Sequence, residues 1–362
     1  MRHKYVLTGA LLASALAAGL LIAQEPADIE PPTFITNVTN VQVPVIVRDA
    51  KGNYVNGLAP VDFELLDQGV PQAIKLDVEA HPISLVVAIQ ADASTRQILP
   101  TIQKASSLFG PIVAGETGEV AILAFDSRIQ ELTPFTSNPD EIKTALGKLK
   151  AGNTPHHLDD AAMQGVRMLH SRPKNRKKVL LLISETRDQG SAVNPRDVMT
   201  QVEFEDVQVY AVTMNHMLNQ LTSKAEPNRP NPIPPEARGP APMGVIRTGT
   251  TDAQTNMGNW TPVFKEVFAL VKGIFIPNSI EVYTKFSGGL EENFVSLGGL
   301  EDALQKMGEE LHSQYLLTFA PTSQEGGYHE LTVRVKVRAN LDVRARYGYW
   351  IAQRGPVEAK KN

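Results

Sequence analysis

The stretch LVVAIQADAS, residues 85–94, decides the fold class of this chain. It begins as a continuous apolar segment, which is typical of a strand buried on both faces of a parallel sheet, and it ends in short polar side chains. Similar apolar segments lie at residues 120–125, 179–183 and 207–214. Helical patterns separate these segments. This alternation predicts an α/β domain with a doubly wound, mostly parallel sheet.

Helix signals support this prediction between the apolar segments. The stretches NPDE (138–141) and NPRD (194–197) each place an Asn at the N-cap and a Pro at the first helical position. Residues 98–109 and 158–170 also have the spacing of helices. Strands that alternate with helices in this way place helices on both faces of the sheet.

The two ends of the chain have a different pattern. Residues 35–80 and 328–350 alternate apolar and polar side chains between Gly- or Asn-bearing turns, which is typical of short strands. We expect residues 328–350 to form a β-hairpin that turns at Ala339-Asn340. The short strands of residues 35–80 are too few to bury both faces of a sheet alone. This hairpin should therefore complete a small β-sandwich that residues 35–80 begin. The α/β domain, residues 82–321, would then be inserted between the two parts.

Residues 217–262 interrupt the α/β pattern. They are rich in Pro, Asn, Arg and Gly and show no periodicity, which predicts an extended insertion.

Residues 1–23 have the pattern of a signal peptide. Arg2 and Lys4 precede an apolar segment that ends in small residues, which predicts export to the periplasm or the extracellular space. An uncleaved anchor is the alternative, since the apolar segment reaches the lower limit for spanning a bilayer. No later segment is long and apolar enough to span, so we expect no transmembrane helix after signal removal.

Composition narrows the classes of function. The chain has 362 residues, 42% of them apolar, which rules out wholesale disorder. It has no cysteine, which excludes disulfide scaffolds, thiol nucleophiles and cysteine-based metal sites. With 35 Lys+Arg against 39 Asp+Glu, its charge gives no reason to expect nucleic-acid binding. Nothing in the composition indicates an oligomeric state.

Catalytic motifs are not evident. The sequence contains no Gly-x-Ser-x-Gly, His-Glu-x-x-His or phosphate-loop pattern, and Ser171-x-x-Lys174 follows a predicted helix instead of beginning one. His156 and His157 are adjacent, and adjacent side chains point apart on a regular backbone, so we expect no zinc site there. The sequence therefore predicts a protein that is not an enzyme, with a hydrolase as the enzymatic alternative.

Seven stretches carry a resemblance to a known family. They are LVVAIQADAS (85–94), VAILAFD (120–126), VLLLISE (179–185), VRDAKG (47–52), DFE (62–64), YLLTFAP (315–321) and RARYGY (344–349). The first three, with the order of elements over residues 83–214, resemble the von Willebrand factor type A (VWA) fold. The other four resemble the flanks of secreted bacterial VWFA-related domain proteins. The resemblance covers nearly all of residues 35–350 except the Pro-rich stretch.

The resemblance implies a metal-ion-dependent adhesion site at the carboxyl end of the sheet, with the pattern Asp-x-Ser-x-Ser, a later Thr and a later Asp. Here Gln90 stands at the first Asp, Asp92 at the first Ser and Ser94 at the second Ser. Thr154 stands at the loop Thr, and Glu185 at the last Asp. Two alternatives follow: Mg²⁺ or a similar divalent ion held by Asp92, Ser94, Thr154 and Glu185, or a degenerate, cofactor-free site held by hydrogen bonds. The neutral amide of Gln90 favours the second.

The function that the resemblance implies is binding. We expect an exported, non-enzymatic VWA-like binding or adhesion module that engages a protein or cell-surface partner through its carboxyl-end loops. The ligand-binding residues expected in these loops are Gln90, Asp92, Ser94, Thr154 and Glu185. The alternative is a structural or assembly protein of the cell envelope in which the degenerate site is silent.

Overall fold

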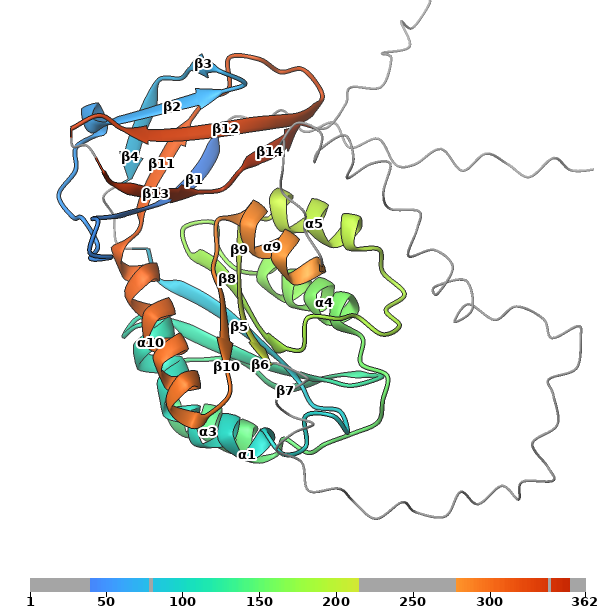
Figure 1. Cartoon of the computed structure of the whole chain (residues 1–362). Helices are drawn as coiled ribbons and strands as arrows, with labels where there is room; N and C mark the ends of the chain where they lie inside the picture. The colour runs from blue at the N-terminus through green and yellow to red at the C-terminus, as the bar shows by residue number, and fades with distance from the viewer. Residues whose placement is uncertain (1–39, 78–80, 215–277, 338–339, 352–362) are drawn as a thin grey trace, which may run out of the picture. The chain divides into compact units, whose positions relative to one another are not determined.

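The computed structural model describes residues 40–77, 81–214, 278–337 and 340–351 (Figure 1). These residues belong to one compact unit of the chain, residues 36–351. The expectations for the signal peptide, residues 1–23, and for the Pro-rich insertion, residues 217–262, lie outside the described residues.

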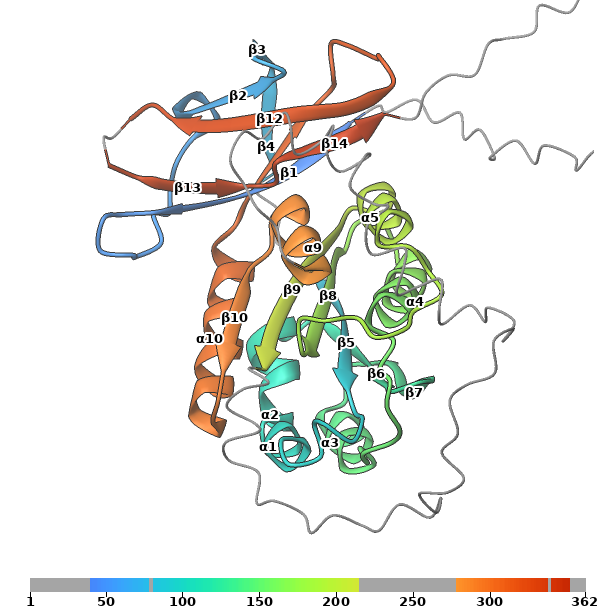
Figure 2. The same cartoon turned by 45° about the vertical axis from the view of Figure 1, so that its right-hand side comes forward.

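The central sheet has six strands in the order β10-β9-β8-β5-β6-β7 (Figure 2). Neighbours pair in parallel except β7, which is antiparallel to β6 at one edge. Every residue of β5 and of β9 is buried, which explains why their sequences lack a polar face. The strands are β5 (Ile83–Gln90), β6 (Glu119–Phe125), β7 (Ile129–Thr136), β8 (Lys177–Ser184), β9 (Val207–Met214) and β10 (Glu291–Phe294).

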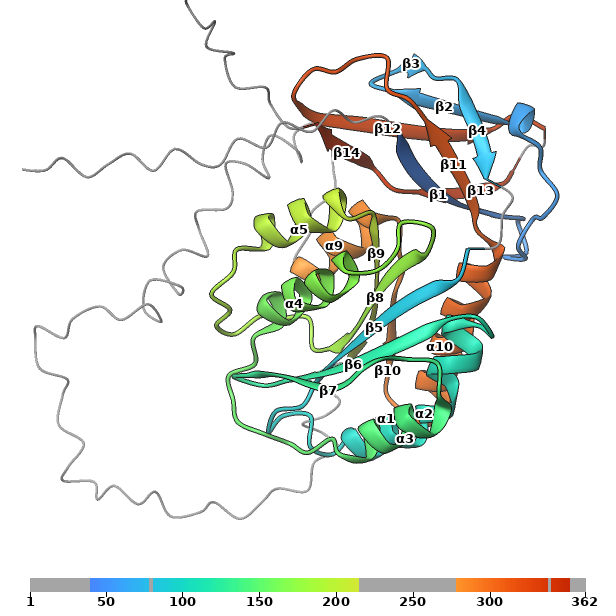
Figure 3. The same ribbon diagram turned by 180° about the vertical axis from the view of Figure 1, so that it is seen from behind.

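Helices cover both faces of this sheet (Figures 1 and 3). Successive side chains of a strand point to opposite faces. Leu85 and Val87 therefore pack in one core with α1, α3 and α10, while Val86 and Ala88 pack in a second core with α4, α5 and α9. The predicted doubly wound α/β class is confirmed. The helices are α1 (Leu99–Lys104), α2 (Ser106–Leu108), α3 (Pro139–Gly147), α4 (Leu158–His170), α5 (Pro195–Phe204), α9 (Ser279–Ser287) and α10 (Leu297–Ser313).

The single helix predicted over residues 98–109 is wrong in its extent. The segment divides into α1 and α2, and a π-helical turn follows over Phe109–Ala114. Pro111 lies in that turn and has no backbone N–H to donate, so a regular α-helix cannot continue through it.

Both predicted Asn N-caps are present. The side-chain oxygen of Asn138 accepts from Asp140 N at 3.0 Å, and that of Asn194 accepts from Arg196 N at 2.9 Å. These bonds satisfy backbone donors that have no partner inside the helix. The local sequence thus fixes where α3 and α5 begin.

We expect the variant Asn194→Ala to lower the free energy of unfolding by ~1 kcal/mol, because it removes the cap of α5. Chemical denaturation measures the change. Asn175→Ala is the matched control, since Asn175 is an exposed residue outside any helix or strand. Equal stability of the Asn194→Ala variant and the wild type would contradict the capping role.

The N- and C-terminal strands form two four-stranded sheets, in the orders β13-β1-β11-β4 and β14-β12-β2-β3. Their apolar faces enclose a third core that includes Val43, Val45, Leu65, Leu317 and Phe319. The strands are β1 (Val41–Arg48), β2 (Phe63–Asp67), β3 (Val70–Pro71), β4 (Ile74–Asp77), β11 (Tyr315–Phe319), β12 (Gly327–Val335), β13 (Asp342–Ala345) and β14 (Gly348–Ile351).

Two expectations about these strands are wrong. Residues 328–350 do not form a simple hairpin: β12 pairs with β14 and β2, while β13 pairs with β1 in the other sheet. The chain changes sheets after β12, which lets both sheets gain a strand for the shared core. In addition, β11 pairs with β1 and β4, so Tyr315–Phe319 belongs to the sandwich and not to the α/β domain.

Among the helices that the structure describes, none is long and apolar enough to cross a bilayer.

Candidate functional site

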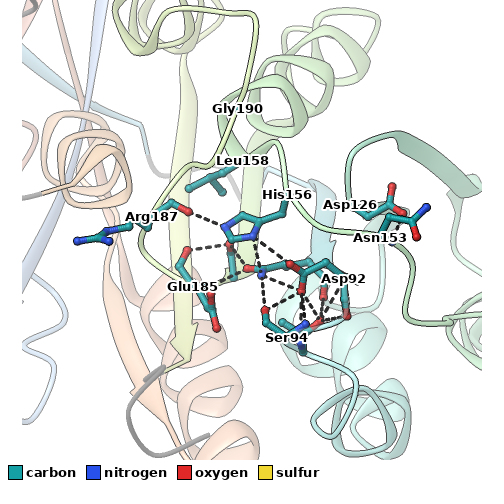
Figure 4. Close-up of polar contacts among 12 residues, drawn as sticks. Asp92, Ser94, Asp126, Asn153, His156, Leu158, Glu185, Arg187 and Gly190 are labelled. Atoms are coloured by element: carbon teal, nitrogen blue, oxygen red, sulfur yellow. Dashed lines mark hydrogen bonds and ion pairs between the residues drawn. The ribbon is translucent and has the colours of Figure 1, made fainter. Parts of the chain in front are cut away.

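The carboxyl ends of β5 and β8 meet because these two strands pair in parallel. Gln90 ends β5, and its side-chain oxygen accepts from Ser184 Oγ at 2.9 Å and from Glu185 N at 2.8 Å. A backbone N–H can only donate, so the contact with Glu185 fixes the orientation of the amide. The Gln90 NH₂ group therefore points toward Asp92 Oδ1 at 3.2 Å and Ser94 Oγ at 3.3 Å. Figure 4 shows Asp92 and Ser94 beside each other in this cluster.

Asp92 is fully buried in the loop that follows β5. Its Oδ1 accepts from Ser94 N at 3.0 Å, Ser94 Oγ at 2.7 Å and Thr95 N at 3.2 Å. Its Oδ2 accepts from His156 Nδ1 at 3.1 Å. Both oxygens of the carboxylate are thus engaged by the protein itself.

Thr154, the expected loop residue, does not reach this cluster. It is exposed, and among the described residues it makes no hydrogen bond to Gln90, Asp92, Ser94 or Glu185. The structure brings those four together, and His156, two residues further along the same loop, contacts Gln90 and Asp92 instead.

Backbone bonds on both sides hold the loop that carries His156. Gly152 N donates to Ala91 O at 2.8 Å, and Gln189 N donates to His156 O at 3.2 Å. The imidazole is fully buried, and its Nε2 lies 2.5 Å from the carbonyl oxygen of Arg187. The ring thereby joins the loop after β5 to the loop after β8.

Asp188 orders the loop after β8. Its Oδ1 accepts from Leu158 N at 2.8 Å and from Ser191 Oγ at 2.6 Å, and its Oδ2 accepts from Gly190 N at 3.0 Å. The loop is therefore fastened to the start of α4. This attachment places the Arg187 carbonyl against the ring of His156.

The cluster shifts the pKa values of its two central groups. Burial alone would raise the pKa of Asp92, but hydrogen bonds from His156, Ser94 and Gln90 hold it far below its usual range. Burial alone would lower the pKa of His156, but Asp92, the Arg187 carbonyl and the charge of Glu185 raise it. Both shifts favour a carboxylate paired with an imidazolium.

A second buried acid lies in the first turn of α4. Asp159 is 3% exposed, and Tyr283 Oη donates to its Oδ1 at 2.8 Å. Burial, together with the charge of nearby Asp188, raises the pKa of Asp159 to about 7. Its burial follows from its contact with Tyr283 of α9.

The residues present do not fit a divalent metal ion. Mg²⁺ requires near-octahedral oxygen ligands at about 2.1 Å. The oxygens of Asp92 already accept from donors of Gln90, Ser94, Thr95 and His156, and the buried ring beside them has a raised pKa. Among the described residues, no group of three or more His, Asp or Glu side chains is arranged to hold a metal.

Ser94 and His156 do not form a nucleophile–base pair. Ser94 Oγ donates to Asp92, and each ring nitrogen of His156 faces an oxygen that accepts. A general base needs a free lone pair directed at the nucleophile, and this geometry does not supply one.

The element order predicted from the resemblance is found in the structure, and the fold is VWA-like. No family model and no curated protein matches the chain. Among solved structures, it is similar to a von Willebrand factor type A protein from Catenulispora acidiphila, with 8% identity, 89% of this chain and 75% of the other covered, and a TM-score of 0.43.

Two further similar structures come from Bacteroides. An aerotolerance-related membrane protein from B. fragilis has 12% identity, covers 63% of this chain and 98% of its own, and has a TM-score of 0.37. BatB from B. thetaiotaomicron has 10% identity, covers 63% and 99%, and has the same TM-score of 0.37. Similarities of this size concern the fold and carry no information about a ligand or partner.

Proposed function

We propose that this chain is an exported, non-enzymatic binding module that engages a protein or cell-surface partner through the loops at the carboxyl end of its central sheet, without a divalent ion. The observation that supports this most is the closed cluster beneath those loops. Both oxygens of the Asp92 carboxylate accept hydrogen bonds from its own chain, so an ion would have to compete with the buried ring of His156 for Oδ2.

The same cluster supports a binding surface above it. Buried hydrogen bonds join the loops, and a binding site needs its side chains held on a rigid base. Around the cluster, each loop presents exposed side chains. They are Ala93, Ser94, Arg96 and Gln97 after β5, Asn153, Thr154 and Pro155 before α4, and Arg187 and Gln189 after β8.

Export rests on residues 1–23, in which Arg2 and Lys4 precede an apolar segment. An extracellular or periplasmic location suits a binding module better than an enzyme that needs a cytoplasmic cofactor, and the chain has no cysteine that oxidation would affect.

The test is affinity capture from envelope and culture fractions with the full chain as bait. The double variant Gln97→Arg/Thr154→Arg changes two exposed carboxyl-end loops, whereas Glu116→Arg/Thr117→Arg changes an exposed turn before β6, at the opposite end of the sheet. We expect the first variant to lose, by at least about tenfold, a partner that the second and the wild type retain, with or without EDTA.

Other outcomes identify other functions. Equal capture by both double variants would exclude the carboxyl-end loops and favour a structural or assembly role through another surface. Loss of capture in EDTA would show that an ion mediates binding.

A further inference from the structure

We propose that a cleft at the amino end of the central sheet is a second binding site, which holds a small oxyanion of the phosphate class. The first residues of β8 and β9 line this cleft, together with residues of β1 and β11 from the sandwich. The loops proposed to engage a partner lie at the opposite, carboxyl ends of β8 and of its neighbour β5. The inference therefore does not depend on the proposed function.

The size and lining of the cleft suit a small, polar ligand. Its volume is about 220 Å³, below the roughly 300–1,000 Å³ of sites that take drug-sized molecules. Most of its lining side chains are polar or charged, and the apolar ones are Pro44, Val202, Phe204, Val207 and Leu316. An apolar ligand would leave the polar groups without water or a partner, so the cleft favours a ligand with charged or hydrogen-bonding groups.

Positive charge exceeds negative charge in this lining. Five of the side chains are Lys or Arg, and two are acidic. They are Lys174, Arg176, Lys177, Lys178 and Arg346 against Glu205 and Asp206, and His81 lies among them. A cleft with such an excess attracts anions and raises their local concentration.

Three of the five cations already have an acid at ion-pair distance. The pairs are Arg176 with Glu119, Lys178 with Glu205, and Arg346 with Glu203 and Asp206. The ring of His81 lies 2.8 Å from Asp77 Oδ2. These contacts include both acids of the lining, so the excess of positive charge belongs to Lys174 and Lys177.

Lys177 is a partly buried cation without an acid partner. Its Nζ donates to the carbonyl oxygen of Leu311 at 3.0 Å, and among the described residues no acid lies at ion-pair distance from it. Burial lowers the pKa of Lys177, and the charge of Asp77 offsets this effect only in part. An ammonium group has three hydrogens, so two remain for an anion in the cleft. Such an anion would also offset the cost of burying the charge.

Lys174 supplies the second cation. It is exposed in the turn before β8, and within the described part of the chain its side chain has neither a hydrogen bond nor an ion pair. The charge of Asp206 acts on it from beyond ion-pair distance, and Asp206 already lies 3.5 Å from Arg346. The long, flexible stem of Lys174 lets its ammonium group approach an anion that Lys177 holds.

Two ammonium groups fit a phosphate group better than a single carboxylate. A phosphate monoester carries about −1.5 to −2 charge at neutral pH and has three strong acceptor oxygens, so it can accept from both lysines at once. Lysine binds phosphate as a point charge and needs no planar partner. A soluble phosphate ester and a phospholipid headgroup share this chemistry.

Titration calorimetry with inorganic phosphate tests the inference on the full chain at pH 7 and constant ionic strength. We expect the wild type to bind, and we expect Lys177→Met to weaken binding at least about tenfold, because Met keeps an apolar side chain of similar length without the charge. Lys174→Met should weaken binding in the same direction. Lys143→Met is the matched control: it changes an exposed lysine of α3 and should bind as the wild type does.

Flotation with phosphatidylcholine vesicles, with and without phosphatidic acid, separates the two sources of phosphate. Binding of inorganic phosphate alone would identify a soluble ligand, whereas binding to phosphatidic acid that Lys177→Met loses would identify a headgroup. No binding in either experiment, or equal binding by Lys177→Met and Lys143→Met, would overturn the inference. If Lys177→Met does not fold, Lys174→Met decides the matter, because it lies in an exposed turn and must bind more weakly than Lys143→Met.

Discussion

The variant Asp159→Asn should gain stability relative to the wild type as the pH rises from 4 to 8, by up to ~4 kcal/mol. Asp159 has a pKa of about 7 in the folded chain, against a reference value of 3.8. At low pH the carboxyl group is neutral in both the folded and the unfolded chain, so its ionisation costs no folding free energy there. Between these two pKa values the unfolded chain ionises first, so the wild type loses stability as the pH rises. The amide of Asn does not titrate, so the variant escapes this loss.

Chemical denaturation at pH 4, 6 and 8 measures the effect. Tyr283→Phe is a second variant that keeps the acid but removes the hydroxyl that donates to it at 2.8 Å. That donation lowers the pKa of Asp159, so its removal should extend the loss of stability to higher pH. The same pH dependence in Asp159→Asn as in the wild type would show that the carboxyl is not protonated in the folded state.

Deleting residues 327–362 should unfold the β-sandwich and leave the α/β domain folded. The deletion removes β12 and β13, which pair with β2 and β1. It also leaves the buried Asp67 without Tyr349 and His329, which lie at 2.8 and 3.1 Å. We expect hydrogen-exchange protection at Val43–Val47 to fall roughly a thousandfold or more.

The amides of β5 and β8 serve as an internal control, because each of these strands pairs with two neighbours inside the central sheet. The deletion removes only the partly buried Tyr328, Tyr347 and Trp350 from the edge of one of their cores. Deletion of residues 352–362 is the matched variant, since it removes no described strand. Unchanged protection at Val43–Val47 after the longer deletion would show that the N-terminal strands are stable without the C-terminal ones.

Much of the fold follows from local patterns in the sequence. The continuous apolar segments of β5, β8 and β9 mark strands buried on both faces, and Asn-Pro pairs mark the starts of α3 and α5. The pairing of β12 with β14 and β2 could not be predicted in this way. Alternation shows that a segment is a strand, but it does not identify the neighbour, which depends on how two sheets share one core.

The site was predictable where its residues follow strand ends. Gln90 and Glu185 end up together because β5 and β8 are parallel neighbours, and Asp92 and Ser94 follow within one loop. His156 was missed, and Thr154 was expected in its place. One signal in the sequence could have indicated such a residue: Asp92 stands where the family pattern has a Ser. A carboxylate buried at that position needs a partner of opposite charge or hydrogen-bond donors. The position of a side chain in an irregular loop depends on its anchors, such as Gly152 and Gln189, which carry no periodic pattern.

The most direct test of a closed, ion-independent cluster is the melting temperature of the wild-type chain in Mg²⁺ and in EDTA. An ion that binds only the folded chain at 100 times its dissociation constant would stabilise it by about 2.7 kcal/mol, a shift that is easily measured. We predict equal melting temperatures in the two solutions. A rise in Mg²⁺ that the variant Asp92→Ala abolishes would contradict the account and place a metal ion at the centre of the site.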